Sequence, residues 1–520
     1  MNTSEFLYIT SLIVPDRTAV IFDGRRITYS DLALRVARLA NALRQLGVEK
    51  GDRIATMEVN CNEHIEAYFA AAKLDAIYVP INFRASQSEV EYMLNDSSPT
   101  VLLAGSRYTD MIELISPKIE SLKALVLIDG VAEGWHTYEK MLDSSSDDEM
   151  FPESDDDDLT MLMFTAGTTG SPKGVMLSHD SFSSYILTNV SPPDMEVEEK
   201  NILTVPLYHI AGVQAVMAAI YGGRTLIIQR QFEPVEWMTL VEQEKANRAM
   251  MVPTMLKMVL DHQEFQNHDL SSLQVITYGA APMPLEVIRR AIAMLPGTFF
   301  INAFGQTETA ATITMLPPED HILEGTDQEI EVKLKRLTSI GKPLEDVEVR
   351  IVSDEGKPVD LGETGEIVAK GSRLMKGYWK QEQATAEALR GGWLYTGDLG
   401  YFDEDGYIFL SGRAKDFIKR GGEMVSPEEV EQVLHSHPAI DEAAIIGVPD
   451  IDWGERVRAI VVAKEGETID GPEVIEYCRS RLSSFKKPES VVVVDKLPRN
   501  PLGKVLKRIL REDFNHPIVE

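Results

Sequence analysis

The sequence predicts an α/β protein whose large N-terminal domain is built from layered α/β halves. Residues 53–81 and residues 201–228 each read as a strand, a helix and a second strand, and such βαβ units pair their strands in parallel. The chain has 520 residues, which is more than one hydrophobic core usually serves. We therefore expect at least two domains with a sizeable core.

An amphipathic helix is predicted before the first βαβ unit. Apolar residues between Leu32 and Leu43 recur at helical spacing, with Ser30 as the expected N-cap and Gly47 as the expected end. The elements expected after this helix are a strand, a helix and a second strand, at residues 53–58, 63–74 and 76–81.

The second unit contains a long uncharged stretch. Residues 201–223 contain no Asp, Glu, Lys or Arg over 23 residues, which is long enough to cross a bilayer. Pro206, His209 and Gly212 interrupt the stretch, so a buried strand, turn and helix are favoured. The first basic residue, Arg17, follows the apolar N-terminal patch, opposite to a secretory signal. We expect neither an integral membrane segment nor export.

Charge and cysteine content restrict the partners and the compartment. The formal net charge of −31 and the sequence pI of about 4.8 would repel nucleic acid and anionic membranes. Part of this acidity lies at residues 144–158, which we expect to form an exposed linker. Cys61 and Cys478 are the only cysteines, which argues against a disulfide framework. These features predict a cytoplasmic protein that binds no nucleic acid.

Residues 165–174, Thr-Ala-Gly-Thr-Thr-Gly-Ser-Pro-Lys-Gly, are typical of a phosphate-binding loop. The glycines let backbone N–H groups converge on phosphoryl oxygens, the hydroxyl groups add contacts, and Lys173 adds a point charge. Apolar runs on both sides predict a strand entering the loop and another leaving it. Pro172 stands where a Walker A loop needs its second glycine. A plain surface turn is the alternative interpretation.

This segment resembles the phosphate loop of the AMP-forming adenylating superfamily, which includes acyl-CoA synthetases, adenylation domains of peptide synthetases and beetle-type luciferases. The resemblance covers nearly the whole chain through the motifs described below. Ala166 stands where that family more often has serine or threonine, so one hydroxyl contact is lost while the backbone cradle should remain. The resemblance implies a large domain at residues 1–411, a hinge at 412–417 and a small, mobile α+β C-terminal domain at 418–520.

Residues 304–308, Phe-Gly-Gln-Thr-Glu, resemble the second signature of the family, with Phe304 where tyrosine is commoner. The resemblance implies that Thr307 bonds an α-phosphate oxygen. It also implies that Glu308 offers a carboxylate to Mg2+, an ion that typically takes one or two protein carboxylates and otherwise phosphate and water. Residues 278–282 resemble the loop on which the adenine ring rests, although a tight strand-to-helix turn explains that pattern equally well.

Residues 395–398, Tyr-Thr-Gly-Asp, read as a turn after a strand and resemble the ribose-binding segment. The resemblance implies that Asp398 accepts hydrogen bonds from both ribose hydroxyls and that Arg413 contacts ribose and phosphate. The residues implied for ATP and AMP binding are Thr165, Gly167, Thr168, Thr169, Gly170, Lys173, Gly279, Ala280, Ala281, Pro282, Asn302, Phe304, Gly305, Gln306, Thr307, Glu308, Asp398, Arg413 and Lys504. The residues implied in catalysis are Lys504, Thr307, Glu308 and Lys173, with Glu308 as the metal ligand.

Residues 206–212 resemble the segment that lines the acyl pocket, with His209 at the position of its gate. Considered without the resemblance, a histidine among apolar residues is more often a core residue. Small side chains leave volume for an apolar acid, and these segments hold no arginine or lysine for a second carboxylate. A monocarboxylic substrate is therefore favoured. The implied acyl-binding residues are His209, Ala211, Gly212, Ala215, Tyr278 and Gly279.

The C-terminal part holds three further features. Ser426 is expected to be an N-cap, with Pro427 at the first helical position and Glu429 completing a capping box. Residues 498–504 resemble the last family motif, whose lysine is Lys504, and Asp416 matches the hinge residue. The residues implied for CoA binding, along the pantetheine tunnel, are Lys419, Gly421, Gly422 and Glu423.

The resemblance as a whole implies an AMP-forming acyl-CoA synthetase that uses ATP, Mg2+ and CoA. It would activate a medium- or long-chain fatty, aromatic or alicyclic acid as an acyl-adenylate and release pyrophosphate. No general base is needed for that step, because the acid is already ionised. Two alternatives stay open: an adenylating enzyme that loads a carrier protein, and a catalytically silent nucleotide-binding protein. The sequence leaves the oligomeric state open, with a homodimer as one option.

Overall fold

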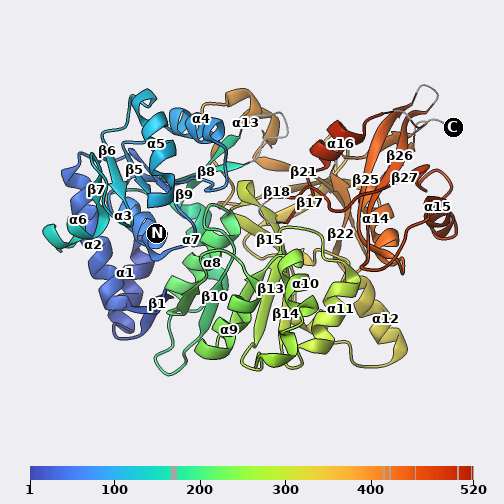
Figure 1. Ribbon diagram of the computed structural model, residues 1–520, viewed down its shortest axis with the longest axis horizontal. Coiled ribbons are helices and arrows are strands. Elements are labelled where there is room, and N and C mark those ends of the chain that lie inside the picture. Colours follow the sequence, from blue (N-terminus) through green and yellow to red (C-terminus); the bar gives the residue numbers. More distant parts are fainter. Residues whose placement is uncertain are drawn as a thin grey trace.

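The computed structural model describes residues 1–165, 172–413, 416–420, 423–450, 453–500, 503–516 and 518. Within these residues the strands form four sheets. Figure 1 shows the elements that follow residue 416, coloured orange to red, gathered at one end of the molecule beside α10 to α12. The predicted α/β class is confirmed, and the second half of the chain holds more strands than the sequence analysis assigned.

The first large sheet is parallel at its centre and antiparallel at both edges. Its strands, in spatial order, are β16 (Lys342–Pro343), β15 (Ala311–Leu316), β14 (Phe299–Gln306), β13 (Val275–Gly279), β12 (Arg248–Met251), β10 (Lys200–Leu203), β11 (Thr225–Ile228), β1 (Thr18–Phe22) and β2 (Arg25–Thr28). The second predicted βαβ unit is confirmed here, because β10 and β11 pair in parallel across a helix.

The second large sheet contains the first predicted βαβ unit, with β3 and β4 in parallel register. Its strands, in spatial order, are β19 (Gly377–Tyr378), β9 (Lys173–Ser178), β8 (Leu159–Thr165), β4 (Ile77–Pro80), β3 (Arg53–Met57), β5 (Val101–Ala104), β6 (Ala124–Leu127) and β7 (His136–Thr137). The antiparallel pair β8 and β9 confirms the two strands that were predicted on either side of the phosphate loop.

Two smaller sheets follow. The strands of the third sheet are β17 (Glu348–Val352), β18 (Gly365–Lys370), β21 (Trp393–Phe402) and β20 (Leu389–Arg390), with β22 (Ile408–Arg413) paired to β21. The strands of the fourth sheet are β24 (Glu423–Val425), β23 (Ile418–Arg420), β26 (Gly454–Ala463) and β25 (Ile440–Asp450), with β27 (Ser490–Val493) paired to β26. All strands after residue 416 therefore belong to one sheet of their own.

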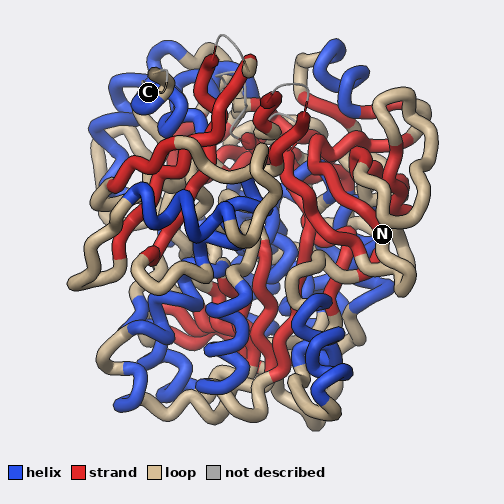
Figure 2. Tube along the Cα trace, turned by 90° about the vertical axis from the view of Figure 1, so that its right-hand side faces the viewer, coloured by secondary structure: helices blue, strands red, loops and turns tan. Residues whose placement is uncertain are grey.

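Helices cover the sheets, and Figure 2 shows them on both flanks of the central strands in the lower half of that view. The α-helices are α1 (Ser4–Ile13), α2 (Tyr29–Gln45), α3 (Asn62–Lys73), α4 (Gln87–Ser97), α5 (Thr109–Ile115), α6 (Tyr138–Ser144), α7 (His179–Asn189), α8 (Ile210–Tyr221), α9 (Pro234–Glu244), α10 (Pro253–Asp261), α11 (Leu285–Met294), α12 (Asp327–Arg336), α13 (Glu382–Ala388), α14 (Pro427–His435), α15 (Gly471–Arg479) and α16 (Lys507–Phe514). The 3-10 turns are η1 (Ser106–Tyr108), η2 (Ser116–Lys118), η3 (Phe265–Asn267), η4 (Thr307–Thr309) and η5 (Pro318–His321).

The largest core lies between the two large sheets. Buried side chains of β1 and β11 in the first sheet join those of β3 and β8 in the second, around α2, α3 and α8. These helices are therefore shared by both sheets, which is the layered arrangement that the sequence predicts. Among the described residues, no helix combines the length and the apolarity that a membrane span requires.

Two local predictions are wrong. The N-cap of α2 is Thr28, whose side chain accepts a hydrogen bond from the backbone N–H of Asp31, and Ser30 lies inside the helix. Asp398 lies within β21 and pairs with Arg413 of β22, instead of lying on a turn after a strand. The strand passes through Gly397 with φ at +73°, a conformation that glycine adopts without strain, so the glycine marks a twist in the strand.

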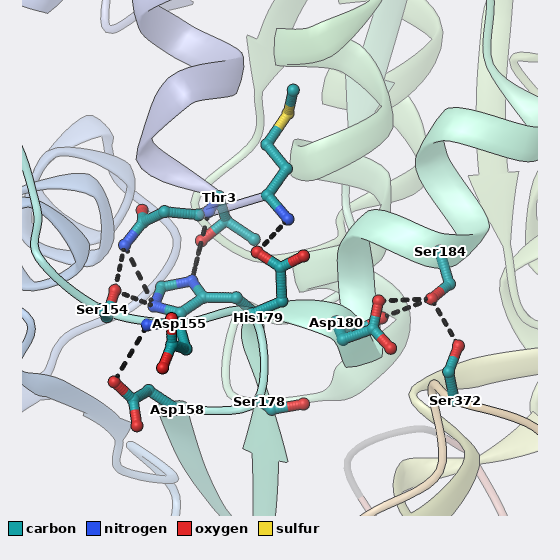
Figure 3. Close-up of polar contacts among 12 residues, drawn as sticks. Thr3, Ser154, Asp155, Asp158, Ser178, His179, Asp180, Ser184 and Ser372 are labelled. Atoms are coloured by element: carbon teal, nitrogen blue, oxygen red, sulfur yellow. Dashed lines mark hydrogen bonds and ion pairs between the residues drawn. The ribbon is translucent and has the colours of Figure 1, made fainter.

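The acidic segment at residues 144–158 is attached to the end of β9. Figure 3 shows His179 between the N-terminal residues and this segment, with Thr3 and Ser154 pointing toward its ring. The backbone N–H of Thr3 donates to Nδ1 of His179 at 3.2 Å, and Oγ of Ser154 lies 3.5 Å from Nε2. Burial lowers the pKa of His179 to about 4, so the ring is neutral and can accept this hydrogen bond. The predicted linker is exposed over much of its length but fastened at this point.

Candidate active site

The phosphate loop is framed by two strand ends. Thr165 closes β8 and Lys173 opens β9, and the two residues are register partners. The remaining predicted contacts of the loop lie outside the described residues; they are Gly167, Thr168, Thr169 and Gly170. The hairpin therefore holds both ends of the glycine-rich segment side by side, at one end of two neighbouring strands of the second sheet.

Lys173 and Glu308 are joined by a residue that the sequence analysis did not identify. The phenol of Tyr378 donates to Oε1 of Glu308 at 2.9 Å, and Nζ of Lys173 lies 4.7 Å from the centroid of the same ring. Tyr378 lies on β19, which pairs with β9, while Glu308 lies in η4 with Thr307. The phosphate loop and the second signature are thus in contact through one side chain.

Glu308 fits the metal role that the resemblance implies. Burial raises the pKa of its carboxyl group, while the hydrogen bond from Tyr378 and the charge of Arg413 act in the opposite direction. A single carboxylate is a sufficient protein ligand for Mg2+, because this ion keeps phosphate and water for its other positions. Glu308 would hold Mg2+ together with the phosphates of ATP.

The second signature leads to the ribose segment. The side chain of Gln306 donates to the backbone carbonyl of Thr396 at 3.3 Å. Oδ1 of Asp398 lies 2.9 Å from Nε of Arg413, and the charge of Asp398 is the main cause that raises the pKa of Arg413. Asp398 is 8% exposed, but the side chain of Arg413 is 39% exposed, so this pair is a partly buried, charge-assisted hydrogen bond.

The predicted adenine loop leaves the carboxyl end of β13. Gly279 pairs with Ala303 of β14, and a Cβ at Gly279 would clash with the carbonyl oxygen of Ala303, so no larger residue fits. Ala280 has φ at +66°, which turns the chain before Ala281 and Pro282. The other predicted residues on β14 follow in the same strand; they are Asn302, Phe304, Gly305 and Gln306.

Tyr278 differs from what a pocket-lining residue would show. Its side chain is 0% exposed and belongs to the core behind the first sheet, where its hydroxyl lies 3.0 Å from Nε2 of His321. Nδ1 of His321 lies 2.9 Å from the carbonyl of Pro317, and burial lowers the pKa of His321 to about 4. Only the backbone of Tyr278 can therefore border an acyl group. The sequence carries no local signal that would identify His321, which comes from η5.

The predicted acyl segment forms the start of α8. His209 is the residue before the helix, its ring centroid lies 4.3 Å from that of Tyr208, and its buried Nε2 has no hydrogen-bond partner among the described residues. Burial, and then the charge of Arg84, lower the pKa of His209 to about 3, so it is neutral at physiological pH. Ala211 and Ala215 are partly exposed and lie one turn apart. Gly212 packs so closely on Pro206 that a Cβ would lie 2.6 Å from its carbonyl oxygen.

Lys504 is the predicted catalytic lysine, and Arg413, Asp398 and Asp416 are among the charged groups that act on it. Its backbone N–H donates to Oδ1 of Asn500 at 2.8 Å, which holds the turn that carries it. The side chain of Lys504 is exposed to solvent. Desolvation by the surrounding protein, and then the charge of Arg413, lower its pKa, whereas the charges of Asp398 and Asp416 raise it. Lys504 therefore lies within electrostatic reach of the Asp398 and Arg413 pair.

The predicted hinge residue Asp416 and the described residues predicted to bind CoA lie where the chain passes from the third sheet to the fourth. Asp416 accepts a hydrogen bond from Arg511 of α16 at 2.8 Å. Lys419 and Glu423 are exposed on β23 and β24, whereas Gly421 and Gly422 lie outside the described residues. Ser426 caps α14 as predicted. The predicted capping box is wrong, because the carboxylate of Glu429 accepts hydrogen bonds from Lys486, at 2.8 and 2.7 Å, and not from the backbone of Ser426.

The family model described as AMP-binding enzyme matches residues 13–379, and the model described as AMP-binding enzyme C-terminal domain matches residues 429–504. A feruloyl-CoA synthase of an Amycolatopsis species is 36% identical over 501 residues, which are 96% of each chain. An indoleacetate–CoA ligase of Aromatoleum aromaticum is 33% identical over 98% of each chain. The long-chain-fatty-acid–CoA ligase FadD13 of Mycobacterium tuberculosis is 34% identical over 94% of this chain and 93% of its own.

A solved structure, the ATP-bound MatB of Rhodopseudomonas palustris, is 29% identical and superposes with a TM-score of 0.87 over 99% of each chain. The apo form of MatB, over the same shares of both chains, gives a TM-score of 0.77. Because both are forms of one protein, the difference indicates that the parts of this chain are arranged more nearly as in the ATP-bound form.

These findings confirm the class that the sequence predicted, an AMP-forming acid–thiol ligase that uses ATP, Mg2+ and CoA. The family model alone covers more than half of the chain, and the relatives align over almost all of it. The chain belongs to the AMP-binding enzyme family.

Proposed function

We propose that this enzyme joins an apolar monocarboxylic acid, aromatic, alicyclic or fatty, to CoA through an acyl-adenylate. One observation carries the proposal: Lys504, from the last part of the chain, lies within electrostatic reach of Asp398 and Arg413. The lysine proposed to act on the α-phosphate and the pair proposed to hold the ribose would then act on the same nucleotide, although they come from separate sheets. The names of the relatives, which include ferulate, indoleacetate and long-chain fatty acids, support the acid class.

In the first step, a carboxylate oxygen of the acid attacks the α-phosphate of ATP. The new bond joins the acyl oxygen to phosphorus, and the bond between the α- and β-phosphates breaks to release pyrophosphate. Lys504 and Thr307 would stabilise the charge on the α-phosphate oxygens, which is worth about 3 kcal/mol for one well-placed donor. His209 is neutral and no proton has to leave the acid, so this step needs no base.

The phosphate loop and Glu308 would hold the rest of the triphosphate. Lys173 and the backbone of the loop bind the β- and γ-phosphates, while Asp398 and Arg413 hold the ribose. Mg2+ bound by Glu308 would neutralise phosphate charge during the transfer. The adenine ring would rest on the backbone of residues 279–282, with Asn302 and residues 304–306 along its edge.

In the second step, the thiol of CoA attacks the acyl carbonyl carbon. A carbon–sulfur bond forms, the bond to AMP breaks, and the thiol proton passes to solvent. We assign residues 1–411 to a large domain, 412–417 to a hinge that includes Asp416, and 418–520 to a small domain that rotates between the steps. Rotation would withdraw Lys504 and present the residues assigned to CoA, which are Lys419, Gly421, Gly422 and Glu423.

The proposal is tested by incubating the purified enzyme with ATP, Mg2+, CoA and one acid at a time. Hydroxycinnamic, indoleacetic, alicyclic, and medium- and long-chain fatty acids form the panel, and pyrophosphate and thioester are measured together. The absence of both products for every acid would overturn the proposal. Thioester that forms only on an added carrier protein would favour the carrier-loading alternative.

The acyl site is tested with Ala211→Tyr, which fills the predicted pocket, and Ala211→Ser as a control of similar size. We expect the tyrosine variant to lose its bulkiest substrates first, while ATP binding is unchanged. A cytoplasmic location and a homodimer are further proposals, the first resting on the paucity of cysteines. Light scattering of the purified protein tests the homodimer.

A further inference from the structure

Residues 375–379, here called the strap, connect the two motifs that would hold the phosphates. The backbone N–H of Met375 donates to the carbonyl of Glu308 at 2.9 Å, and that of Trp379 donates to the carbonyl of Gly174 at 2.7 Å. One end of the strap is thus attached to the second signature and the other end to the strand that leaves the phosphate loop. A residue between these two attachments is therefore held in a defined place between the two motifs.

Tyr378 lies between the two attachments of the strap, and its side chain contacts both motifs. Its hydroxyl donates to Oε1 of Glu308 at 2.9 Å, and its ring lies under the ammonium of Lys173, 4.7 Å from the centroid. The backbone N–H of Tyr378 donates to Oγ1 of Thr385 at 2.8 Å, which holds the residue from α13 behind it. The side chain of Tyr378 therefore contacts two groups of opposite charge, and the backbone of Tyr378 is fixed by the hydrogen bond to Thr385.

The chemistry of a phenol suits both contacts. The hydroxyl group of a tyrosine side chain is an O–H donor, so it can donate to the carboxylate of Glu308. A hydrogen bond to one carboxylate oxygen restricts the rotation of the carboxylate. The face of an aromatic ring attracts a cation within about 6 Å without neutralising it, so Lys173 keeps its charge for a phosphate.

We propose that Tyr378 positions the two charged groups that hold Mg2+ and ATP, with its hydroxyl orienting Glu308 and its ring supporting Lys173. This proposal rests on the function proposed above, because it takes both groups to face the phosphates of the nucleotide. Tyr378 acts through Glu308 and Lys173, so it is a positioning residue. Its removal should weaken the binding of metal and nucleotide while the affinity for the acid is unchanged.

The hydroxyl is tested with Tyr378→Phe, which keeps the ring. Binding of ATP is measured by titration calorimetry without acid or CoA, once with Mg2+ and once with EDTA. We expect the affinity for ATP with Mg2+ to fall about tenfold, the usual effect of losing a hydrogen bond to a charged group, and the affinity in EDTA to be unchanged. Equal affinities of the wild type and the variant in Mg2+ would overturn the proposal.

A double-mutant cycle with Glu308→Gln distinguishes positioning from a general structural role. If the hydroxyl acts through the carboxylate, Tyr378→Phe should have no further effect on binding with Mg2+ once Glu308 is replaced. A loss of the same size in both backgrounds would overturn the positioning role. Glu308→Gln keeps the shape of the side chain and removes only its charge. The cycle therefore still measures the coupling between Tyr378 and Glu308 when each single variant is less stable.

The ring is tested by comparing Tyr378→Leu with Tyr378→Phe. The leucine variant should bind ATP more weakly than the phenylalanine variant even in EDTA, because Lys173 loses the surface on which it lies. Equal binding by the two variants in EDTA would overturn this part. Tyr401→Phe is the matched control, since Tyr401 stacks on Phe409 at 5.3 Å in the third sheet and should leave both affinities unchanged.

The failure of this proposal can be distinguished from failure of the proposed function. The acid panel tests the function through pyrophosphate and thioester, and it needs only the wild type. The binding experiments contain neither acid nor CoA, so they report on Tyr378 whether or not an acid substrate is found. Normal ligase activity with unchanged metal-dependent binding in Tyr378→Phe would leave the function standing and overturn only the role of Tyr378.

Discussion

Lys257 on α10 and Asp441 on β25 form an ion pair, with Nζ 3.0 Å from Oδ1. This contact links the part of the chain that carries the nucleotide residues to the part that carries Lys504. Close by, a Cβ at Gly503 would clash with the side chain of Thr254, which is also on α10. The turn next to Lys504 and the edge of the fourth sheet are therefore both seated on the N-terminal half of one helix.

Replacing Asp441 by Asn should weaken the arrangement in which the charges of Asp398 and Arg413 act on Lys504. Both side chains of the pair are about one third exposed, at 32% and 33%, so its contribution is modest, about 0.2 to 1 kcal/mol. We expect acid-dependent pyrophosphate exchange to fall by at most about fivefold. Thioester formation from a supplied acyl-adenylate should not fall. Asp261→Asn, which removes the partner of Lys257 within α10, is the control, and equal losses in both half-reactions would contradict the prediction.

Lys504→Ala should slow the formation of the acyl-adenylate much more than the formation of the thioester. We expect the rate of acyl-adenylate formation to fall roughly hundredfold to thousandfold, the usual effect of removing a preorganised donor, while a supplied acyl-adenylate is still converted to thioester. The control is Lys496→Ala, an exposed lysine of the same C-terminal region. Measuring both rates in each variant checks the prediction, and a loss in the second rate as large as in the first would contradict it.

The first half-reaction should also depend on pH through Lys504. Partial desolvation by the surrounding protein, and then the charge of Arg413, lower the pKa of this lysine. Only its protonated form carries the charge that the α-phosphate needs. The rate should therefore fall as pH rises, with a midpoint below the ordinary lysine value of 10.5. A pH profile of pyrophosphate exchange tests this, and Lys504→Arg should move the midpoint to higher pH.

Elements with strong local patterns could be predicted from the sequence. Both βαβ units, the hairpin around residues 165–174 and the capped start of α14 at Ser426 all depend on residues close together in the chain. The N-cap of α2 could not be predicted, because serine is generally preferred over threonine at this position, and only the hydrogen bond from the backbone N–H of Asp31 selects Thr28.

Contacts between distant segments could not be predicted in the same way. Tyr378 lies outside every motif that the sequence analysis used, and its partner Glu308 is 70 residues away. The sequence predicts that Gly397 is part of a turn, whereas it lies inside β21, which pairs with β18 on both sides of it, at Tyr395 and at Leu399. The burial of Tyr278 depends on His321, which reaches it from a separate 3-10 turn. Each of these features is decided by tertiary packing, which overrides the local pattern.

Asp398→Ala should weaken ATP binding severely. Asp398 would lose its hydrogen bonds to the ribose, and the guanidinium of Arg413 would lose the carboxylate 2.9 Å away. Hydrogen bonds of a charged group are each worth about 1.5 to 3 kcal/mol, so we expect the affinity to fall roughly tenfold to hundredfold. Titration with ATP measures this. The exposed Glu404→Gln, between β21 and β22, should change nothing, and an unchanged affinity in Asp398→Ala would contradict the assigned role.

Stability should fall between pH 6.5 and pH 4 because of buried neutral histidines. Burial lowers the pKa values of His64, His179 and His321 from 6.5 to about 4. Between pH 6.5 and pH 4 these histidines are protonated in the unfolded chain but neutral in the folded protein. Lowering the pH through this window therefore favours unfolding, and the free energy of unfolding decreases. At pH 5 each histidine should cost about 2 kcal/mol relative to pH 7.

Urea unfolding of the wild type and of His179→Asn at the two pH values tests this assignment. The variant is less stable at pH 7, because it loses the hydrogen bond from Thr3, but it no longer carries a group that must be kept neutral. Its midpoint should therefore fall less than that of the wild type on going to pH 5. The exposed His136→Asn should follow the wild type at both values. A His179→Asn midpoint that falls as far as the wild-type midpoint would show that the acid sensitivity arises at other groups.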